Sequence, residues 1–88
     1  MVVIVKKMDE TYKNYLLDLG DLAKEYALDA KKEYISSKGT EKEEYQSGYL
    51  MAMYTIVSLM QTQAKAFNIS LEELKLSDIK AEDLLKEK

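Results

Sequence analysis

The side chains with the best-defined chemical spacing in this 88-residue chain are carboxylates. Grouped carboxylates attract a divalent cation or a basic partner. Four acidic residues recur at intervals of three and four, which places them along one ridge of a helix: Asp18, Asp21, Glu25 and Asp29. Magnesium and calcium need several converging oxygen ligands, and no loop in the sequence offers that geometry. We therefore expect a solvated helix face at this ridge and no metal site.

Two acidic pairs, each spaced by three residues, match the spacing of a known enzyme class. The pairs are Asp18 with Asp21 and Glu41 with Glu44. Here the chain resembles the all-helical nucleotide pyrophosphohydrolases, which set such pairs on facing helices around magnesium. The resemblance implies a metal-dependent hydrolase as an alternative function. In a helical hairpin the two pairs lie roughly 25 Å apart at 1.5 Å per residue, so only a second subunit would bring them together.

Other kinds of catalysis lack the residues that they need. The chain has no cysteine, histidine or tryptophan, which removes the usual general base near neutral pH and a common zinc ligand. No serine lies in a nucleophile motif, and no glycine-rich segment could hold a phosphate. The net charge is -3 and every basic residue is lysine, whereas arginine supplies the fork that grips phosphate and guanine. We expect no catalytic residue, no cofactor and no nucleic-acid partner.

The most apolar stretch runs from Gly48 to Met60 and must lie at the centre of the fold. It is too short to cross a bilayer, which takes about 20 apolar residues, so we predict no membrane contact and a helix over residues 41–67. At about 100° per residue its apolar side chains fill an arc of roughly 200°, about twice what one neighbour covers. One facet consists of Tyr45, Tyr49, Ala52, Ile56 and Leu59; the other consists of Leu50, Met53, Val57, Met60 and Ala64.

A first helix over residues 9–37 is the expected neighbour. Asp9 is a suitable N-cap. Gly39 is suited to end this helix, and Thr40 with Glu43 has the spacing of a capping box that starts the next. So short a connection makes the two helices antiparallel neighbours. The apolar face of the first helix consists of Met8, Tyr12, Tyr15, Leu16, Leu19, Leu22, Ala23, Tyr26, Ala27, Ala30 and Tyr34.

The two ends of the chain are expected to add smaller elements. Residues 1–7, MVVIVKK, lack the features of a signal peptide, and we predict a short strand or extended strip. Asn68 tolerates the left-handed conformation that ends the second helix. Ser70 with Glu73 forms a second capping-box pattern, opening a short helical tail over residues 70–86. The chain 1–88 is predicted to be a single helical domain, and a cytoplasmic one because no export signal is evident.

The predicted fold class is all-α: an antiparallel hairpin of two long helices with short C-terminal helices. A core of this size is marginal, and the tail looks too small to cover the second facet of helix 41–67. We therefore predict a homodimer, a four-helix bundle, whose contact face consists of Leu50, Met53, Val57, Met60 and Ala64. Leu17, Leu28 and Ile35, on the back of the first helix, are either scattered surface residues or a second contact seam.

The expected function follows from contact surfaces, since reactive groups are missing. Tyrosine suits a boundary that is apolar along the ring and wet at the hydroxyl, and methionine suits adaptable protein contacts. We predict a small non-catalytic interaction protein of a regulatory, adaptor or immunity-like kind, which acts by burying a helix face. The biological partner stays open. In general appearance the chain is similar to small helical bacterial proteins.

Overall fold

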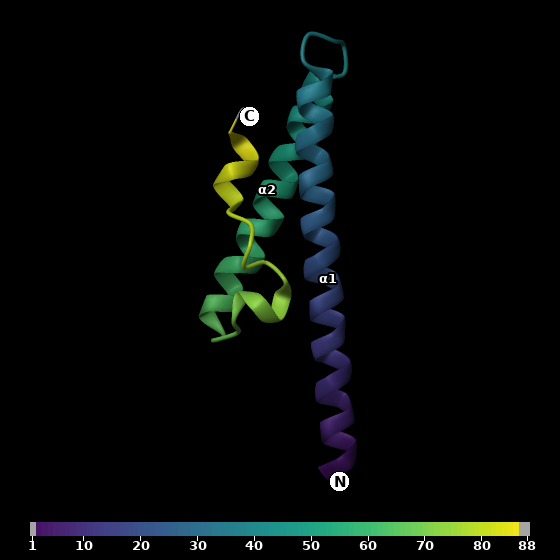
Figure 1. Cartoon of the computed structure of the whole chain (residues 1–88), viewed down its shortest axis with the longest axis vertical. Coiled ribbons are helices and arrows are strands. Elements are labelled where there is room, and N and C mark those ends of the chain that lie inside the picture. Colours follow the sequence, from purple (N-terminus) through teal and green to yellow (C-terminus); the bar gives the residue numbers. More distant parts are fainter. Residues whose placement is uncertain (1, 87–88) are drawn as a thin grey trace.

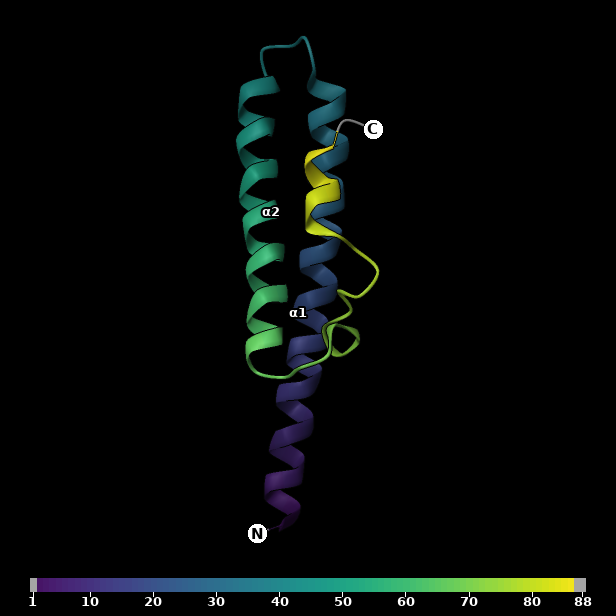
Figure 2. The same ribbon diagram turned by 90° about the vertical axis from the view of Figure 1, so that its left-hand side faces the viewer.

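The computed structural model describes the backbone of residues 2–86 and the side chains of residues 10–86. Within this range the chain is all-helical and has no strand. Two long helices, α1 (Val2–Ser37) and α2 (Glu43–Ala66), pack side by side as a hairpin, as predicted (Figure 1). Two short 3-10 helices follow, η1 (Leu71–Leu74) and η2 (Ala81–Leu85). The molecule is elongated, 59 × 19 × 16 Å, because the N-terminal end of α1 runs past the end of α2 (Figure 2).

Helix α1 begins earlier than the sequence suggested. The extended strip predicted at residues 1–7 is wrong for residues 2–7, which are helical, and Met1 lies outside the described residues. Asp9 accordingly lies inside the helix and is not its N-cap. The physical reason is that β-branched residues cost only a few tenths of a kcal/mol each in a helix. Extending an existing helix is cheap compared with starting one, and no proline or glycine interrupts this segment.

The turn between the helices uses the predicted residues in a different arrangement. Helix α1 ends at Ser37, and Gly39 has the expected left-handed conformation with φ of 83°. The capping box of Thr40 and Glu43 is not formed, and α2 begins at Glu43 with no side-chain cap. The Thr40 hydroxyl instead donates to the Ser37 carbonyl at 2.6 Å, while the Glu43 carboxylate accepts from the Gly39 N–H at 3.0 Å. Both side chains close the turn, so neither caps α2.

The C-terminal segment follows the sequence-based prediction closely. Asn68, just after α2, has φ of 60°. At the start of η1 both bonds of the Ser70 and Glu73 capping box are present, each at 3.3 Å. From there residues 68–86, which we call the tail, run back along the hairpin with η2 beside α1 and α2 (Figure 2).

The core lies where the tail meets the hairpin. Val57, Leu76 and Leu84 are its largest fully buried side chains. One cluster joins Leu50, Met53 and Val57 of α2 to Ala81 and Leu84, and a second joins Ala64 to Leu74 and Leu76. Helix α1 contributes small residues, Ala27 and Ala30, to the first cluster. Small side chains on α1 therefore leave the room that the tail occupies.

Candidate functional site

The facet predicted as the dimer face is buried within the single chain. Leu50, Met53, Val57 and Ala64 are each at most 6% exposed, and Met60 is half-buried. They pack against the two alanines of α1 and the apolar residues of the tail. The assignment of this facet as a partner-binding surface is therefore corrected: the tail covers it. Two single-turn helices suffice because α1 presents alanine and glycine at this seam instead of larger side chains.

Polar side chains of the hairpin hold the tail in place. The Gln61 amide donates to the carbonyl oxygens of Leu76 at 3.1 Å and Ile79 at 2.9 Å. On α1, the Lys31 ammonium donates to the Asp83 carbonyl oxygen at 2.7 Å. Carbonyl groups in an irregular segment lack the backbone N–H partners that a helix or sheet provides, so side-chain donors form hydrogen bonds with them instead. These contacts fix the path of the tail along both helices.

An ion pair adds a further tie between α1 and the tail. The Lys24 ammonium contacts both carboxylate oxygens of Asp78, at 3.0 and 3.2 Å. The hydrogen bond from Lys24, together with its charge, holds the pKa of the Asp78 carboxyl below its ordinary value. Asp78 is largely exposed, so the pair contributes modestly to stability.

The other apolar facet of α2 lies open to solvent. Tyr45 is 72% exposed and Leu59 58%, and Tyr49, Ala52 and Ile56 are also exposed. The prediction that the other facet meets a second copy leaves this one for the first helix, and the structure contradicts that arrangement. Several members of the predicted apolar face of α1 are open as well: Tyr12, Tyr15, Leu19, Leu22 and Tyr26.

The open residues of the two helices share one side of the hairpin. The buried stripe of α1 runs through Ala27 and Ala30. Lys24 and Lys31 lie along one edge of this stripe and reach the tail. The helical period puts the opposite edge at Leu19, Leu22 and Tyr26. On α2, Gln61 marks the tail side in the same way. Figure 1 shows the tail on one side of the hairpin, and no other described element covers the opposite side. We call this surface the open face: Tyr15, Leu19, Leu22 and Tyr26 of α1 with Tyr45, Tyr49, Ala52, Ile56 and Leu59 of α2.

The spacing within the open face is typical of a helix–helix seam. On α1 its residues follow one another at intervals of four, three and four, and on α2 at four, three, four and three. Such alternation keeps a stripe facing a neighbouring helix over several turns. The stripe that α1 uses inside the chain, through Ala23, Ala27 and Ala30, has the same alternation. Each long helix therefore carries two seams, of which one is filled.

The acidic residues lie on the back of α1, away from α2. Asp18, Glu25 and Asp29 are exposed and Asp21 is half-buried. Glu41 and Glu44 lie at the turn end of the hairpin, so a single chain does not bring the two acidic pairs together. No group of three acidic residues close enough to hold a metal ion occurs among the described residues. Leu28 and Ile35 on the same back are exposed, while Leu17 is half-buried.

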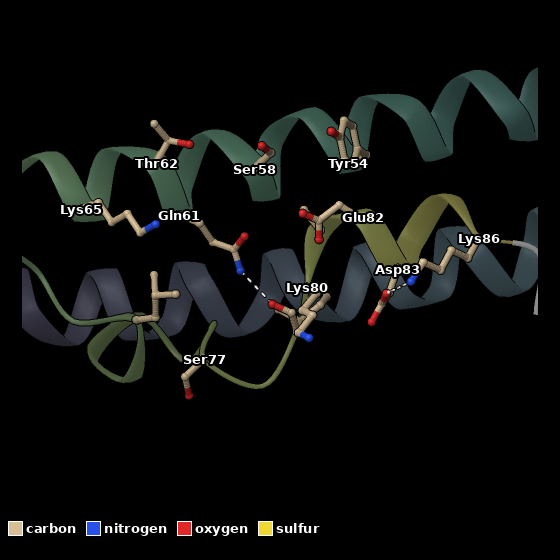
Figure 3. Close-up of a pocket in the computed structure, with 13 residues that line it drawn as sticks. Tyr54, Ser58, Gln61, Thr62, Lys65, Ser77, Lys80, Glu82, Asp83 and Lys86 are labelled. Atoms are coloured by element: carbon tan, nitrogen blue, oxygen red, sulfur yellow. Dashed lines mark hydrogen bonds and ion pairs between the residues drawn. The ribbon is translucent and has the colours of Figure 1, made fainter.

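A groove of about 840 Å³ with both polar and apolar lining lies between α2 and the tail (Figure 3). Helix α2 lines it with Tyr54, Ser58 and Thr62. The tail lines it with positively charged lysines and negatively charged carboxylates. Gln61 spans it with its bonds to the tail backbone, and Lys86 pairs with Asp83 at 3.1 Å. Within the described residues no buried side-chain polar atom is left without a partner. No buried polar side chain of the groove is therefore left unpaired.

Comparison with known proteins adds no assignment. The chain matches no protein-family model, no curated protein and no solved structure. No described helix has both the length and the apolar composition needed to cross a membrane. The open face is thus the surface on which a functional interpretation rests.

Sequence reasoning missed the residues that anchor the tail. Gln61, Lys24 and Gly20 were not among the residues predicted to make contacts. A Cβ atom at residue 20 would collide with the Leu74 carbonyl oxygen, so this glycine lets the tail backbone approach α1. One signal was available: Gly20 occupies the same stripe as Ala23, Ala27 and Ala30, where small residues mark a close approach.

Proposed function

We propose that the chain is a small non-catalytic helical interaction protein, of a regulatory, adaptor or immunity-like kind, that works by burying its open face. The observation that carries this proposal is the open face itself, two adjacent seams of exposed apolar side chains. Large contiguous patches of exposed apolar side chains mark contact sites in soluble proteins. The alternation of three and four along both seams favours a helical partner.

A second copy of the chain is the partner that fits best. A standard interface takes about 800 Å² from each partner. The four tyrosines of the open face, 39–72% exposed, offer on the order of 500 Å² at about 150–250 Å² per aromatic side chain. Leu19, Leu22, Ile56 and Leu59 add to this area. Two hairpins meeting by this face form a four-helix bundle, in which each helix uses both of its seams.

Sedimentation velocity tests this proposal. We expect the wild type to sediment as a dimer at tens of micromolar. Ile56→Glu adds a charge at the centre of the face and should give a folded monomer, while Asn14→Glu adds the same charge at an exposed position on the back of α1 and should leave the dimer intact. A wild type that stays monomeric at hundreds of micromolar would leave the face to a different protein or to no partner.

A further inference from the structure

The uncharged surface of the molecule is centred on α2 and not on the seam between the two helices. No residue of α2 from Tyr45 to Ala64 carries a charge. Its exposed residues continue from the open face round to the side away from α1, where they include Gly48, Met51 and Thr55. On α1 the open-face stripe is bordered instead by exposed carboxylates, among them Asp18 and Glu25. The surface that can be desolvated at a low free-energy cost is therefore narrow on α1 and wide on α2.

In a two-fold dimer the centre of the contact patch lies on the symmetry axis, so residues near the centre meet the same helix of the other copy. Building on the dimer proposed above, we infer that α2 packs antiparallel against α2 of a second copy, with Ala52 beside the axis. The α1 stripes, Tyr15 to Tyr26, then flank this central helix pair. Partner contact is thus concentrated on α2.

The distribution of charge along α2 favours the antiparallel direction. Glu43 and Glu44 lie in its first turn and Lys65 in its last, and these are its charged residues. A parallel pair would set the two glutamates of each copy beside their own counterparts. In an antiparallel pair with Ala52 opposite Ile56 of the other copy, Glu43 lies opposite Lys65 of the other copy. The residue numbers of both pairs have the same sum, so one alignment of the two helices produces both. Unlike charges then meet at each end of the interface.

Gly48 agrees with a close approach on this side of α2. An added Cβ at this position would meet nothing within 4 Å in the single chain. Glycine inside a helix is less favourable than alanine, and no neighbour within the chain accounts for it here. A second helix passing near Gly48 and Ala52 would use the space that the missing side chains leave.

Single-cysteine crosslinking tests the geometry directly, because the chain has no cysteine of its own. In the inferred register, the two copies of residue 52 are offset by about 6 Å along the helices and those of residue 45 by about 27 Å at 1.5 Å per residue. A short bismaleimide should therefore join Ala52→Cys into a covalent dimer at least tenfold faster than Tyr45→Cys. Asn14→Cys, an exposed position on the back of α1, is the matched control and should crosslink as slowly as Tyr45→Cys. All three positions are exposed, so folding should persist.

Each other outcome overturns a stated part of the inference. Crosslinking of Tyr45→Cys as fast as that of Ala52→Cys, with both much faster than the control, would mean a parallel α2 pair. Faster crosslinking of Leu22→Cys than of Ala52→Cys would place the axis on α1. A dimer in sedimentation without selective crosslinking at residue 52 would refute this geometry and leave the proposed function standing, whereas a wild-type monomer would refute the dimer itself and leave the open face to a different protein or to no partner.

Discussion

The carbonyl group of Leu74 lies against the backbone of Gly20, so that the η1 segment of the tail touches α1 with no side chain between them. This contact brings the stripe of small residues on α1, which includes Gly20 and Ala23, against the irregular tail. It explains why α1 carries a glycine in its middle: the position serves tertiary packing.

Gly20→Ala should destabilise the protein even though alanine is the better helix former. The new Cβ would collide with backbone atoms of Leu74, which cannot rotate away as a flexible side chain could. Overpacking costs about 1–3 kcal/mol, against a gain of about 1 kcal/mol in helix propensity. We expect urea denaturation to show a lower free energy of unfolding.

Gly48→Ala is the matched control for that change. Nothing lies within 4 Å of the added Cβ, so in dilute, monomeric protein the substitution should stabilise by up to about 1 kcal/mol. If Gly20→Ala raised the free energy of unfolding as much as Gly48→Ala, the close contact with Leu74 would be wrong.

Gln61→Ala should loosen the tail. It removes both hydrogen bonds to the carbonyl groups of Leu76 and Ile79 and should cost about 1–3 kcal/mol, because it leaves partly buried acceptors without a donor. Amide hydrogen exchange should accelerate in residues 74–84 before it does so in α2. Gln63→Ala, an exposed glutamine of the same helix, should change neither measurement. Equal effects at the two positions would show that Gln61 does not hold the tail.

The ion pair between Lys24 and Asp78 should make stability depend on pH in the acid range. The pKa of Asp78 is lower in the folded chain, through the hydrogen bond and charge of Lys24. The folded state therefore binds the proton less readily, and the contribution is present above the unfolded pKa of about 3.9 and is lost as pH falls through the folded value. Asp78→Asn should lose a small part of the stability at pH 7 and flatten the acid limb of the curve. An unchanged curve would mean that the pair is not formed in solution.

Magnesium and manganese should not stabilise the protein. The acidic residues of α1 are spread along its back, and no described acidic cluster could chelate a metal. A ligand that binds only the folded state raises the melting temperature, so we expect the same thermal unfolding curve with and without millimolar metal. A rise that Asp18→Asn or Glu44→Gln abolished would favour a hydrolase assembled across subunits.

The local features of the fold could be predicted because short-range chemistry determines them. The left-handed conformations at Gly39 and Asn68 and the capping box of Ser70 and Glu73 follow from residue type over a few positions. The long helices follow from their apolar period. The box of Thr40 and Glu43 failed because the threonine oxygen accepts from the Lys42 N–H instead of the Glu43 N–H, while its proton goes to the Ser37 carbonyl.

The orientation of α2 could not be predicted because its two apolar facets are nearly equivalent in sequence. Leu50, Met53 and Val57 are no more apolar than Tyr49, Ile56 and Leu59 taken together. The tail determines which facet is buried. Its docking depends on the close backbone approach at Gly20 and on hydrogen-bond donors such as Gln61, which in the sequence resemble ordinary surface residues. The candidate site was therefore assigned to the facet that the tail covers, while the open face lies on the other.

The open face also gives the protein an internal optical reporter. The chain has no tryptophan, so its seven tyrosines provide nearly all of its near-ultraviolet absorption and emission. Four of them, Tyr15, Tyr26, Tyr45 and Tyr49, lie on the open face. Whatever covers this surface will remove water from most of the chromophores at once, so unlabelled protein should register its own binding as a shift in the tyrosine spectrum.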